Sequence, residues 1–166
     1  MAYDASFWAW ALQRWQTPGI EGQLIALQDE HGLVILEMLF LAWLGTTGRI
    51  LSRDRWQHMI DRADPWVVSV VQPLRAQRRA WSDSPEHRTL KASLKVLEVA
   101  AERELAKIYV GAMDLSDMAS LKQTDEKTDK VANATFCNLQ LGAARAAPPL
   151  DTVDVSRLAG LLSIDC

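Results

Sequence analysis

Residues 33–44 read Leu-Val-Ile-Leu-Glu-Met-Leu-Phe-Leu-Ala-Trp-Leu. On a helix of 3.6 residues per turn, the apolar side chains of this stretch point to every side, which is typical of a helix buried in the middle of a protein. Gly32 precedes the stretch and Gly45 follows it, and glycine commonly marks the end of a helix. The sequence therefore predicts a central buried helix at 33–44, against which the other elements pack.

Helical spacing extends over most of the chain, because apolar residues recur every three to four positions in several stretches. Asp64-Pro65 and Ser84-Pro85 are each expected to start a helix, since both pairs combine a capping residue with a proline at the first helical position. Pro73 is expected to kink or split the helix that contains it. We predict an all-α protein: a single compact bundle of about six or seven helices around the central apolar helix 33–44, with a short C-terminal tail helix.

A break in composition lies near the C-terminus. The 166 residues suit one domain, and the Ala-Ala-Pro-Pro stretch at 146–149 interrupts the helical pattern. We expect a helical domain at 1–145 and, at 146–166, a Pro-containing spacer followed by a short amphipathic tail helix. Such a helix is too short to be stable alone in water. The leucines of this helix are Leu158, Leu161 and Leu162. They must contact this domain, a neighbouring subunit of a homo-oligomer, or another protein.

Composition excludes several classes of protein. Two cysteines are too few for a disulfide framework, and 23% charged residues is ordinary for a globular chain. The longest apolar stretch, 33–44, is shorter than the about 20 residues that cross a bilayer. The N-terminus lacks the basic and apolar regions of a signal peptide. We therefore expect a cytoplasmic protein with no transmembrane segment.

Charge is distributed unevenly along the chain. Residues 1–48 carry a net charge of −4, residues 49–95 carry +5, and residues 96–166 carry −4. The basic part includes Arg75, Arg78 and Arg79, which are candidates to contact an acidic protein surface. Nucleic-acid binding through residues 75–95 is a weaker alternative, because the sequence pI is about 5.6 and no nucleic-acid motif occurs.

Glu37 stands in the middle of the predicted apolar helix. A lone carboxylate is costly to bury, so Glu37 needs a cationic partner, a raised pKa or a polar cavity. Candidate partners are Arg75, Arg78, Arg79 and Arg103. The alternative is a pocket for a small molecule, formed by Gln28, Asp29, Glu37 and Arg103.

Motifs of known chemistry are missing from the sequence. There is no Gly-x-Ser-x-Gly nucleophile, neither cysteine has an evident histidine partner, and the repeated Glu-x-x-His pairs of a helical di-iron site do not occur. We therefore expect no catalytic residue, no cofactor and no metal, and the sequence favours a protein that is not an enzyme.

Several short motifs occur together in the first part of the chain: Phe7-Trp8, Pro18-Gly19-Ile20, Leu27-Gln28-Asp29-Glu30-His31-Gly32, Phe40 and Trp43-Leu44-Gly45. Three more follow: Pro73-Leu74-Arg75, Arg78-Arg79 and Glu102-Arg103. In this combination the chain resembles a small family of uncharacterised proteobacterial proteins, classified as a domain of unknown function, over roughly residues 6–110. The resemblance implies a compact helical protein and no particular activity. Where family members often carry Asp-Val-Asn, this chain has Val34-Ile35-Leu36.

Seven tryptophans are unusually many for a chain of this length. Most of them fit core positions, but Trp10 lies at the edge of the inner face of its helix, and a partly exposed tryptophan is favoured at binding surfaces. The leading hypothesis is a non-enzymatic adaptor or regulatory module that binds another protein through a basic face and exposed aromatic side chains. Its candidate contact residues are Trp10, Arg75, Arg78, Arg79, Leu158, Leu161 and Leu162.

Overall fold

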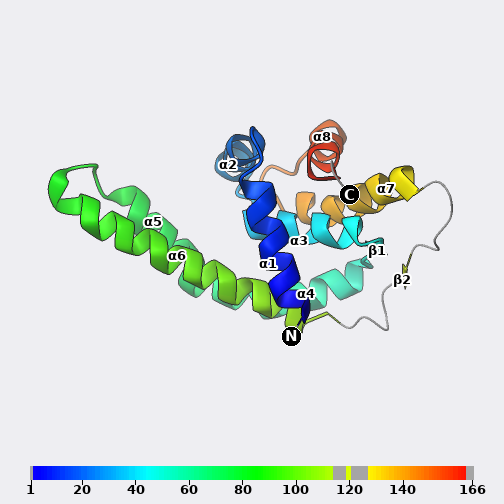
Figure 1. Ribbon diagram of the computed structural model, residues 1–166, viewed down its shortest axis with the longest axis horizontal. Helices are drawn as coiled ribbons and strands as arrows, with labels where there is room; N and C mark the ends of the chain where they lie inside the picture. Colours follow the sequence, from blue (N-terminus) through cyan, green and yellow to red (C-terminus); the bar gives the residue numbers. More distant parts are fainter. Residues whose placement is uncertain (1, 114–118, 121–126, 164–166) are drawn as a thin grey trace. The chain divides into compact units, whose positions relative to one another are not determined.

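A computed structural model of the chain describes residues 2–113, 119–120 and 127–163 (Figure 1). The elements are α1 (Ala2–Trp15), α2 (Ile20–His31), α3 (Ile35–Thr46), β1 (Arg49–Ile50), α4 (Arg53–Trp66), the π-helix η1 (Val67–Val71), α5 (Gln72–Ala80), α6 (Pro85–Gly111), β2 (Ala119–Ser120), α7 (Lys127–Ala143) and α8 (Thr152–Ser163). The strands β1 and β2 form a two-residue antiparallel pair. The predicted all-α class is confirmed, including the short C-terminal helix.

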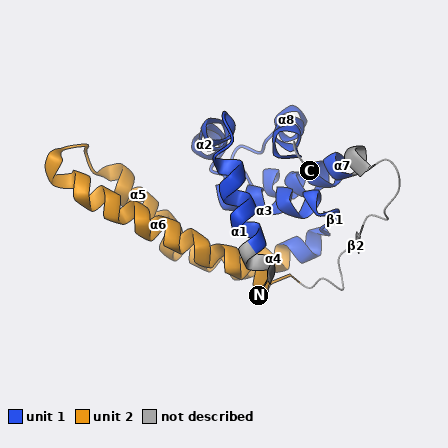
Figure 2. Ribbon diagram, in the orientation of Figure 1, with its two compact units in different colours: residues 1–56, 114–166 blue, residues 57–113 orange. Residues whose placement is uncertain are grey.

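The chain forms two compact units, one of residues 1–56 and 114–166 and the other of residues 57–113 (Figure 2). The boundary falls inside α4, so that one helix contributes to both. The tail helix α8 packs within the first unit, on α7 and α3. The division into a helical domain at 1–145 and a spacer with a tail helix at 146–166 remains a prediction.

The helix α3 forms the core of the first unit. Every residue from Ile35 to Gly45 is buried, and α3 packs most extensively against α7. The prediction of a central apolar helix is confirmed, with a start two residues later than expected. Val34 is extended and forms the N-cap, while Gly32 adopts the left-handed conformation (φ 67°) that ends α2 and favours glycine.

An aromatic cluster joins α1 to α3. The ring centroid of Phe7 lies 5.2 Å from that of Phe40, in an edge-to-face arrangement, and 5.4 Å from that of Trp43. Such pairs add about 0.5–1.5 kcal/mol beyond the area that they bury. Of the tryptophans that fit core positions, Trp43 and Trp56 are buried, whereas Trp8, Trp15 and Trp66 are half-buried.

Two glycines let α3 and α7 approach closely. A Cβ atom on Gly45 would lie 2.3 Å from the backbone Cα of Thr135, and one on Gly142 would lie 2.6 Å from the sulfur of Met38. Asn138 of α7 then bonds three backbone groups: it accepts from the Leu51 amide (2.9 Å) and donates to the carbonyls of Leu41 (3.2 Å) and Arg49 (2.8 Å). These bonds fix α3 and residues 49–51 to α7.

The second unit consists mainly of a helical hairpin, α5 with α6. The prediction that Asp64-Pro65 starts a helix is wrong, because Pro65 lies inside α4. Ala63, Val67 and Val71 are buried on either side of this proline, and burial of these side chains outweighs the lost hydrogen bond. Pro73 stands at the start of α5, directly after the π-helical turn. The predicted start at Ser84-Pro85 is confirmed as the beginning of α6.

Candidate functional site

The residues singled out from the sequence are divided between the two units. Trp10, Gln28, Asp29, Glu37, Leu158, Leu161 and Leu162 belong to the first unit, and Arg75, Arg78, Arg79 and Arg103 belong to the second.

Glu37 has a cationic partner on α7's C-terminal side. Its side chain is buried, and Arg145 Nη1 donates to Glu37 Oε2 at 2.9 Å. The sequence-based choice of partners is wrong: Arg75 and Arg78 bond other carboxylates, and Arg145 was not among the candidates. Arg145 follows α7 in the chain and lies 108 positions from Glu37, a separation at which no sequence pattern indicates contact.

Gln28 and Asp29 lie in the last turn of α2. Gln28 is half-buried and Asp29 is exposed, while the Gly32 amide donates to the Gln28 carbonyl at 2.9 Å. The last residue of α2, His31, contacts the 146–149 spacer: its carbonyl accepts from the Ala147 amide at 2.8 Å, and its Nδ1 lies 2.8 Å from the Pro148 carbonyl oxygen. Because a carbonyl oxygen only accepts, the His31 Nδ1 is the protonated nitrogen.

Trp10 is half-buried, in agreement with its predicted partial exposure. The guanidinium carbon of Arg14, one turn further along α1, lies 5.5 Å from the centroid of the Trp10 ring. Arg14 is itself 5% exposed. This cation–π contact gives one face of the indole an intramolecular neighbour.

The tail leucines mostly face inward. Leu158 and Leu162 are buried, and Leu161 is half-buried. The Asp154 amide donates to Asp151 Oδ1 at 2.8 Å, so Asp151 caps α8 at its start. The tail helix could contact its own domain, a neighbouring subunit or another protein. In the structure it packs on its own chain, against α7 and α3.

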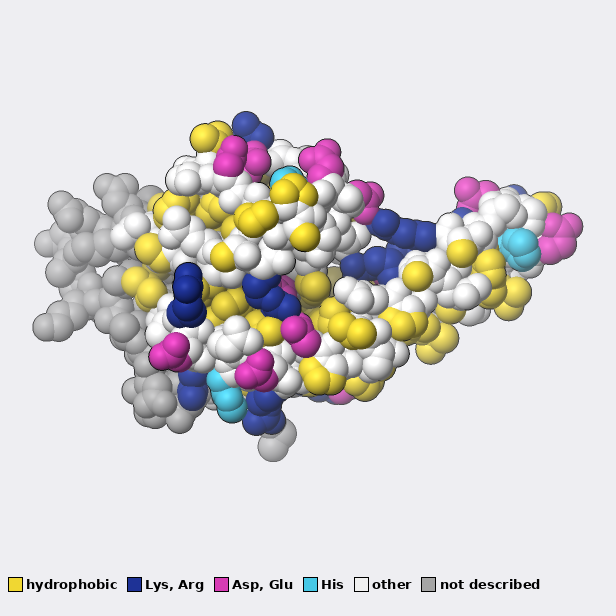
Figure 3. Space-filling model, turned by 180° about the vertical axis from the view of Figure 1, so that it is seen from behind, with side chains coloured by type: hydrophobic (Ala, Val, Ile, Leu, Met, Phe, Trp, Pro, Cys, Tyr) yellow, Lys and Arg dark blue, Asp and Glu magenta, His cyan; other side chains and the backbone are white. Residues whose placement is uncertain are grey.

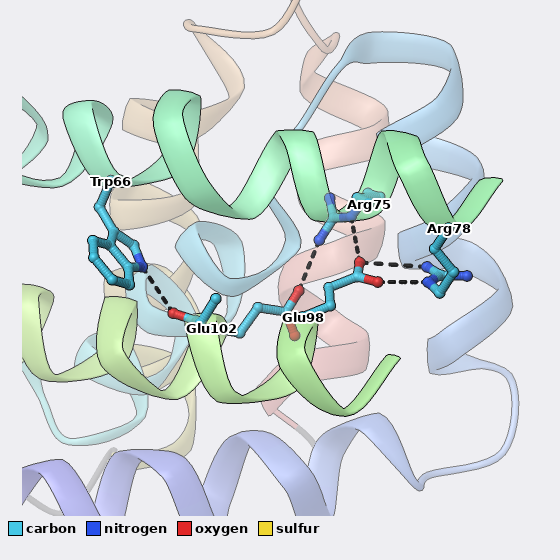
Figure 4. Close-up of polar contacts among 6 residues, drawn as sticks. Trp66, Arg75, Arg78, Glu98 and Glu102 are labelled. Atoms are coloured by element: carbon cyan, nitrogen blue, oxygen red, sulfur yellow. Dashed lines mark hydrogen bonds and ion pairs between the residues drawn. The ribbon is translucent and has the colours of Figure 1, made fainter. Parts of the chain in front are cut away.

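A cluster of four charged side chains joins α5 to α6 (Figure 4). Glu98 accepts from Arg75 Nε at 2.8 Å and from Arg78 Nε at 2.5 Å, and Arg78 Nη2 lies 3.3 Å from the other Glu98 oxygen. Arg75 Nη2 also donates to Glu102 at 2.7 Å. Arg75 and Arg78 thus lie in the seam of the hairpin, with their charges offset by two carboxylates, whereas Arg79 is exposed.

Folding shifts the pKa values of the two carboxyl groups of this cluster in opposite directions. Burial alone would raise the pKa of Glu98, but hydrogen bonds from Arg78 and Arg75 outweigh it and hold that pKa below its ordinary value. Burial raises the pKa of Glu102, and the attraction of Arg75 only partly offsets the effect. The hydrogen bond to Glu98 raises the pKa of Arg78. Glu98 is therefore the ionised centre of the cluster.

Further contacts close the hairpin at its two ends. Trp66 Nε1 donates to the Ala101 carbonyl at 2.9 Å. Near the connection between α5 and α6, the ring of Trp81 stacks on that of His87, with 5.8 Å between the ring centroids. Lys91 forms an ion pair with Asp83 in the same region. The hairpin is thus held largely by polar contacts, and α5 itself has no buried residue.

The other side of α6 carries apolar side chains at the surface. Val96 is 69% exposed and Val99 is 42% exposed, and hydrophobic side chains are visible along the surface of the hairpin (Figure 3). Arg88, Lys95 and Arg103 are also exposed. We call these five residues, Arg88, Lys95, Val96, Val99 and Arg103, the α6 outer stripe. The stripe was not predicted from the sequence, in which Val96 and Val99 do not stand out from the other apolar residues of this helix.

Neither a metal-binding cluster nor a membrane-spanning helix is found in the described part of the chain. Within residues 2–113, 119–120 and 127–163, no group of three or more His, Cys, Asp or Glu side chains could hold a metal ion. None of the helices in this part of the chain combines the length and apolar character needed to cross a membrane.

The fold and the surface together define an all-α protein with a buried central helix and a helical hairpin whose seam is ion-paired. The chain belongs to the family described as Protein of unknown function (DUF2390), which matches residues 6–108. This match confirms the resemblance to a domain of unknown function. Neither the comparison with curated proteins nor the comparison with solved structures found a match.

Proposed function

We propose that this protein is a non-enzymatic adaptor or regulatory module that binds another protein through the exposed side of α6. The observation that carries the proposal is the exposure of large aliphatic side chains on one helix: Leu90, Val96, Leu97 and Val99 are all exposed. Exposed aliphatic side chains that gather on one face of a helix, as Val96 and Val99 do three positions apart, mark interaction sites more often than ordinary surface. We further propose that the protein acts in the cytoplasm of a bacterial cell.

The ion pairs of the hairpin support this assignment in a specific way. Arg75 and Arg78 bond Glu98 and Glu102, so their role in the proposal is to hold α5 on α6 and keep the binding helix rigid. A rigid surface loses less conformational entropy when a partner binds. We therefore assign the proposed interaction surface to α6 rather than to Trp10 and the tail leucines.

Glu37 argues for protein binding over the small-molecule alternative. Its carboxylate is 3% exposed and is bonded by Arg145 at 2.9 Å, which gives it the structural partner that a buried carboxylate needs.

The test is affinity capture of proteins from the native cell with three forms of the tagged full-length chain. Val96→Lys combined with Val99→Lys disrupts the proposed surface, and Val153→Lys on α8 is the matched control because Val153 is also exposed, at 64%. At least one protein should be retained by the wild type and by the control, and should be depleted about tenfold or more by the double variant, which corresponds to about 1.4 kcal/mol. Identical protein sets from all three forms would contradict the proposal.

A further inference from the structure

The five residues of the α6 outer stripe lie along one side of a single helix. They recur at positions 88, 95, 96, 99 and 103, with Ala92 between the first two, and intervals of three and four residues bring side chains onto one face. Glu98, which meets α5, lies on a different side of the helix. From Arg88 to Arg103 the stripe extends about 22 Å, or about four helical turns.

Charge on this stripe has one sign. Arg88, Lys95 and Arg103 are cationic, and none of the four glutamates of α6 stands at a stripe position. Within the described residues, no ion pair is found for these three cations, although Arg88 lies near Asp83, whose pKa is lowered mainly by the hydrogen bond from Lys91 and also by the charge of Arg88. Other cations of α6 do have acidic neighbours: Lys91 pairs with Asp83, and Lys107 pairs with Glu104 at 2.6 Å.

The order of charged and apolar side chains indicates what the stripe fits. Val96 and Val99 lie in the middle, and the cations lie beside and beyond them. When two helices pack side by side, apolar residues form the seam and charged residues along its edges select the partner. The complement of this stripe is a helix with its own apolar seam and with Asp or Glu at the edges.

Two other classes of partner fit less well. Three cations spread over about four turns are few compared with the about 6–10 phosphate contacts of a typical DNA-binding protein. The sequence pI of about 5.6 and the net charge of −3 also oppose binding to a polyanion. Helices that lie on membranes present large side chains such as Trp, Phe and Leu, whereas the centre of this stripe is formed by valines.

We propose that the α6 outer stripe binds an acidic amphipathic helix of a partner protein, with an apolar seam on Val96 and Val99 and carboxylates against Arg88, Lys95 and Arg103. This inference rests on the proposed function and adds the chemistry of the partner to it. Attraction between opposite charges across such a surface contributes mainly to specificity and to the rate of association.

The test uses synthetic fluorescein-labelled helical peptides and the full-length chain. One peptide carries leucines at the seam and glutamates at its edges, and the matched peptide carries glutamine in place of each glutamate. Fluorescence anisotropy should show saturable binding of the acidic peptide, weakened about tenfold by the glutamine exchange and weakened further as salt is raised. Lys95→Glu combined with Arg103→Glu should weaken binding of the acidic peptide about tenfold or more and should allow an equivalent lysine-edged peptide to bind.

Arg53→Glu combined with Arg62→Glu is the matched control, since both arginines are exposed on α4 and the change in net charge is the same. This control should bind the acidic peptide like the wild type, and circular dichroism should show the same helix content for all forms. The inference is overturned if the acidic peptide does not bind, or if it binds the Lys95/Arg103 variant as tightly as the wild type. It is also overturned if the Lys95/Arg103 variant keeps its binding of the acidic peptide and loses binding of single-stranded RNA, of phosphatidylserine vesicles or of a second copy of the chain.

The two proposals fail in different ways. If the Val96/Val99 variant loses a captured protein while the peptides show no dependence on charge, the proposed function stands and the acidic helix is rejected. If capture does not depend on Val96 and Val99, the proposed function itself is rejected.

Discussion

Glu37 and Arg145 form an ion pair of 2.9 Å although 108 positions separate them in the chain. The carboxylate stands in the buried helix α3, and the guanidinium arrives from the segment that follows α7. The side chain of Arg145 is only about one-third exposed, so water screens the pair less than it screens a surface ion pair. The contact links the central helix to the start of the spacer that precedes α8.

Arg145→Met is expected to lower the free energy of unfolding by about 3 kcal/mol, because it leaves the buried carboxylate without its guanidinium. Glu37→Leu should cost less, since Arg145 can turn toward water. The double variant should recover most of the loss, because a buried ion pair is often replaced by apolar side chains without penalty. Urea denaturation followed by circular dichroism measures all three; a double variant that is less stable than Arg145→Met would show that the pair does not act in this way.

Glu98→Gln should destabilise the hairpin by about 3 kcal/mol at pH 7, because Arg75 and Arg78 both lose their shared carboxylate. The pKa of Glu98 is lowered by folding, so its contribution is fully present above its unfolded pKa of about 4.3 and is lost as the pH falls through the lower folded value. The variant should therefore show a flatter decline of stability in acid than the wild type.

Glu102→Gln is the control for this titration. The pKa of Glu102 is raised by folding, so ionisation of this group opposes folding at neutral pH and the opposition disappears as the pH falls through the raised value. We expect a change of about 1 kcal/mol or less at pH 7. Thermal unfolding between pH 3 and pH 8 distinguishes the two variants, and equal losses for both would contradict the assignment of Glu98 as the centre.

Asn138→Ala should lower stability by about 2–4 kcal/mol, since it removes three hydrogen bonds to the backbone of Leu41, Arg49 and Leu51. Asn138→Asp should be at least as harmful, because a carboxylate cannot donate to the Leu41 and Arg49 carbonyls. Asn133→Ala on the same helix is the control, as Asn133 is exposed. Midpoints of urea denaturation give the comparison, and a similar midpoint for all three variants would rule out the proposed role of Asn138.

Gly45→Ala should be among the most harmful single changes in the first unit. The new methyl group would lie 2.3 Å from the backbone of Thr135, which cannot move without displacing α7. Gly142→Ala should cost less, about 1–3 kcal/mol, because the atoms that it meets belong to the flexible side chains of Met38 and Leu41. Gly160→Ala meets open space in α8 and should stabilise the protein by up to about 1 kcal/mol, so the order of the three melting temperatures tests the close packing of α3 on α7.

Local sequence was sufficient for the helices themselves. The apolar circumference of 33–44 identifies α3 as buried, Gly32 marks the end of α2, and Ser84-Pro85 marks the start of α6. These features depend on side-chain periodicity and on backbone preferences within one or two turns, and both can be read along the chain. The continuation of α4 through Pro65 could not be read in this way, because buried side chains around the proline hold the helix together.

The partners of the charged side chains were decided only by tertiary structure. Arg75 and Arg78 were predicted to form an outward basic face, but the turn at residues 81–84 brings Glu98 and Glu102 against them. Arg145 reaches Glu37 for the same reason, and Val96 and Val99 remain at the surface because the inner side of α6 is occupied by this ion-paired seam. Long-range electrostatic pairing depends on which helix faces meet, and that is determined by the packing of the whole chain rather than by any local pattern.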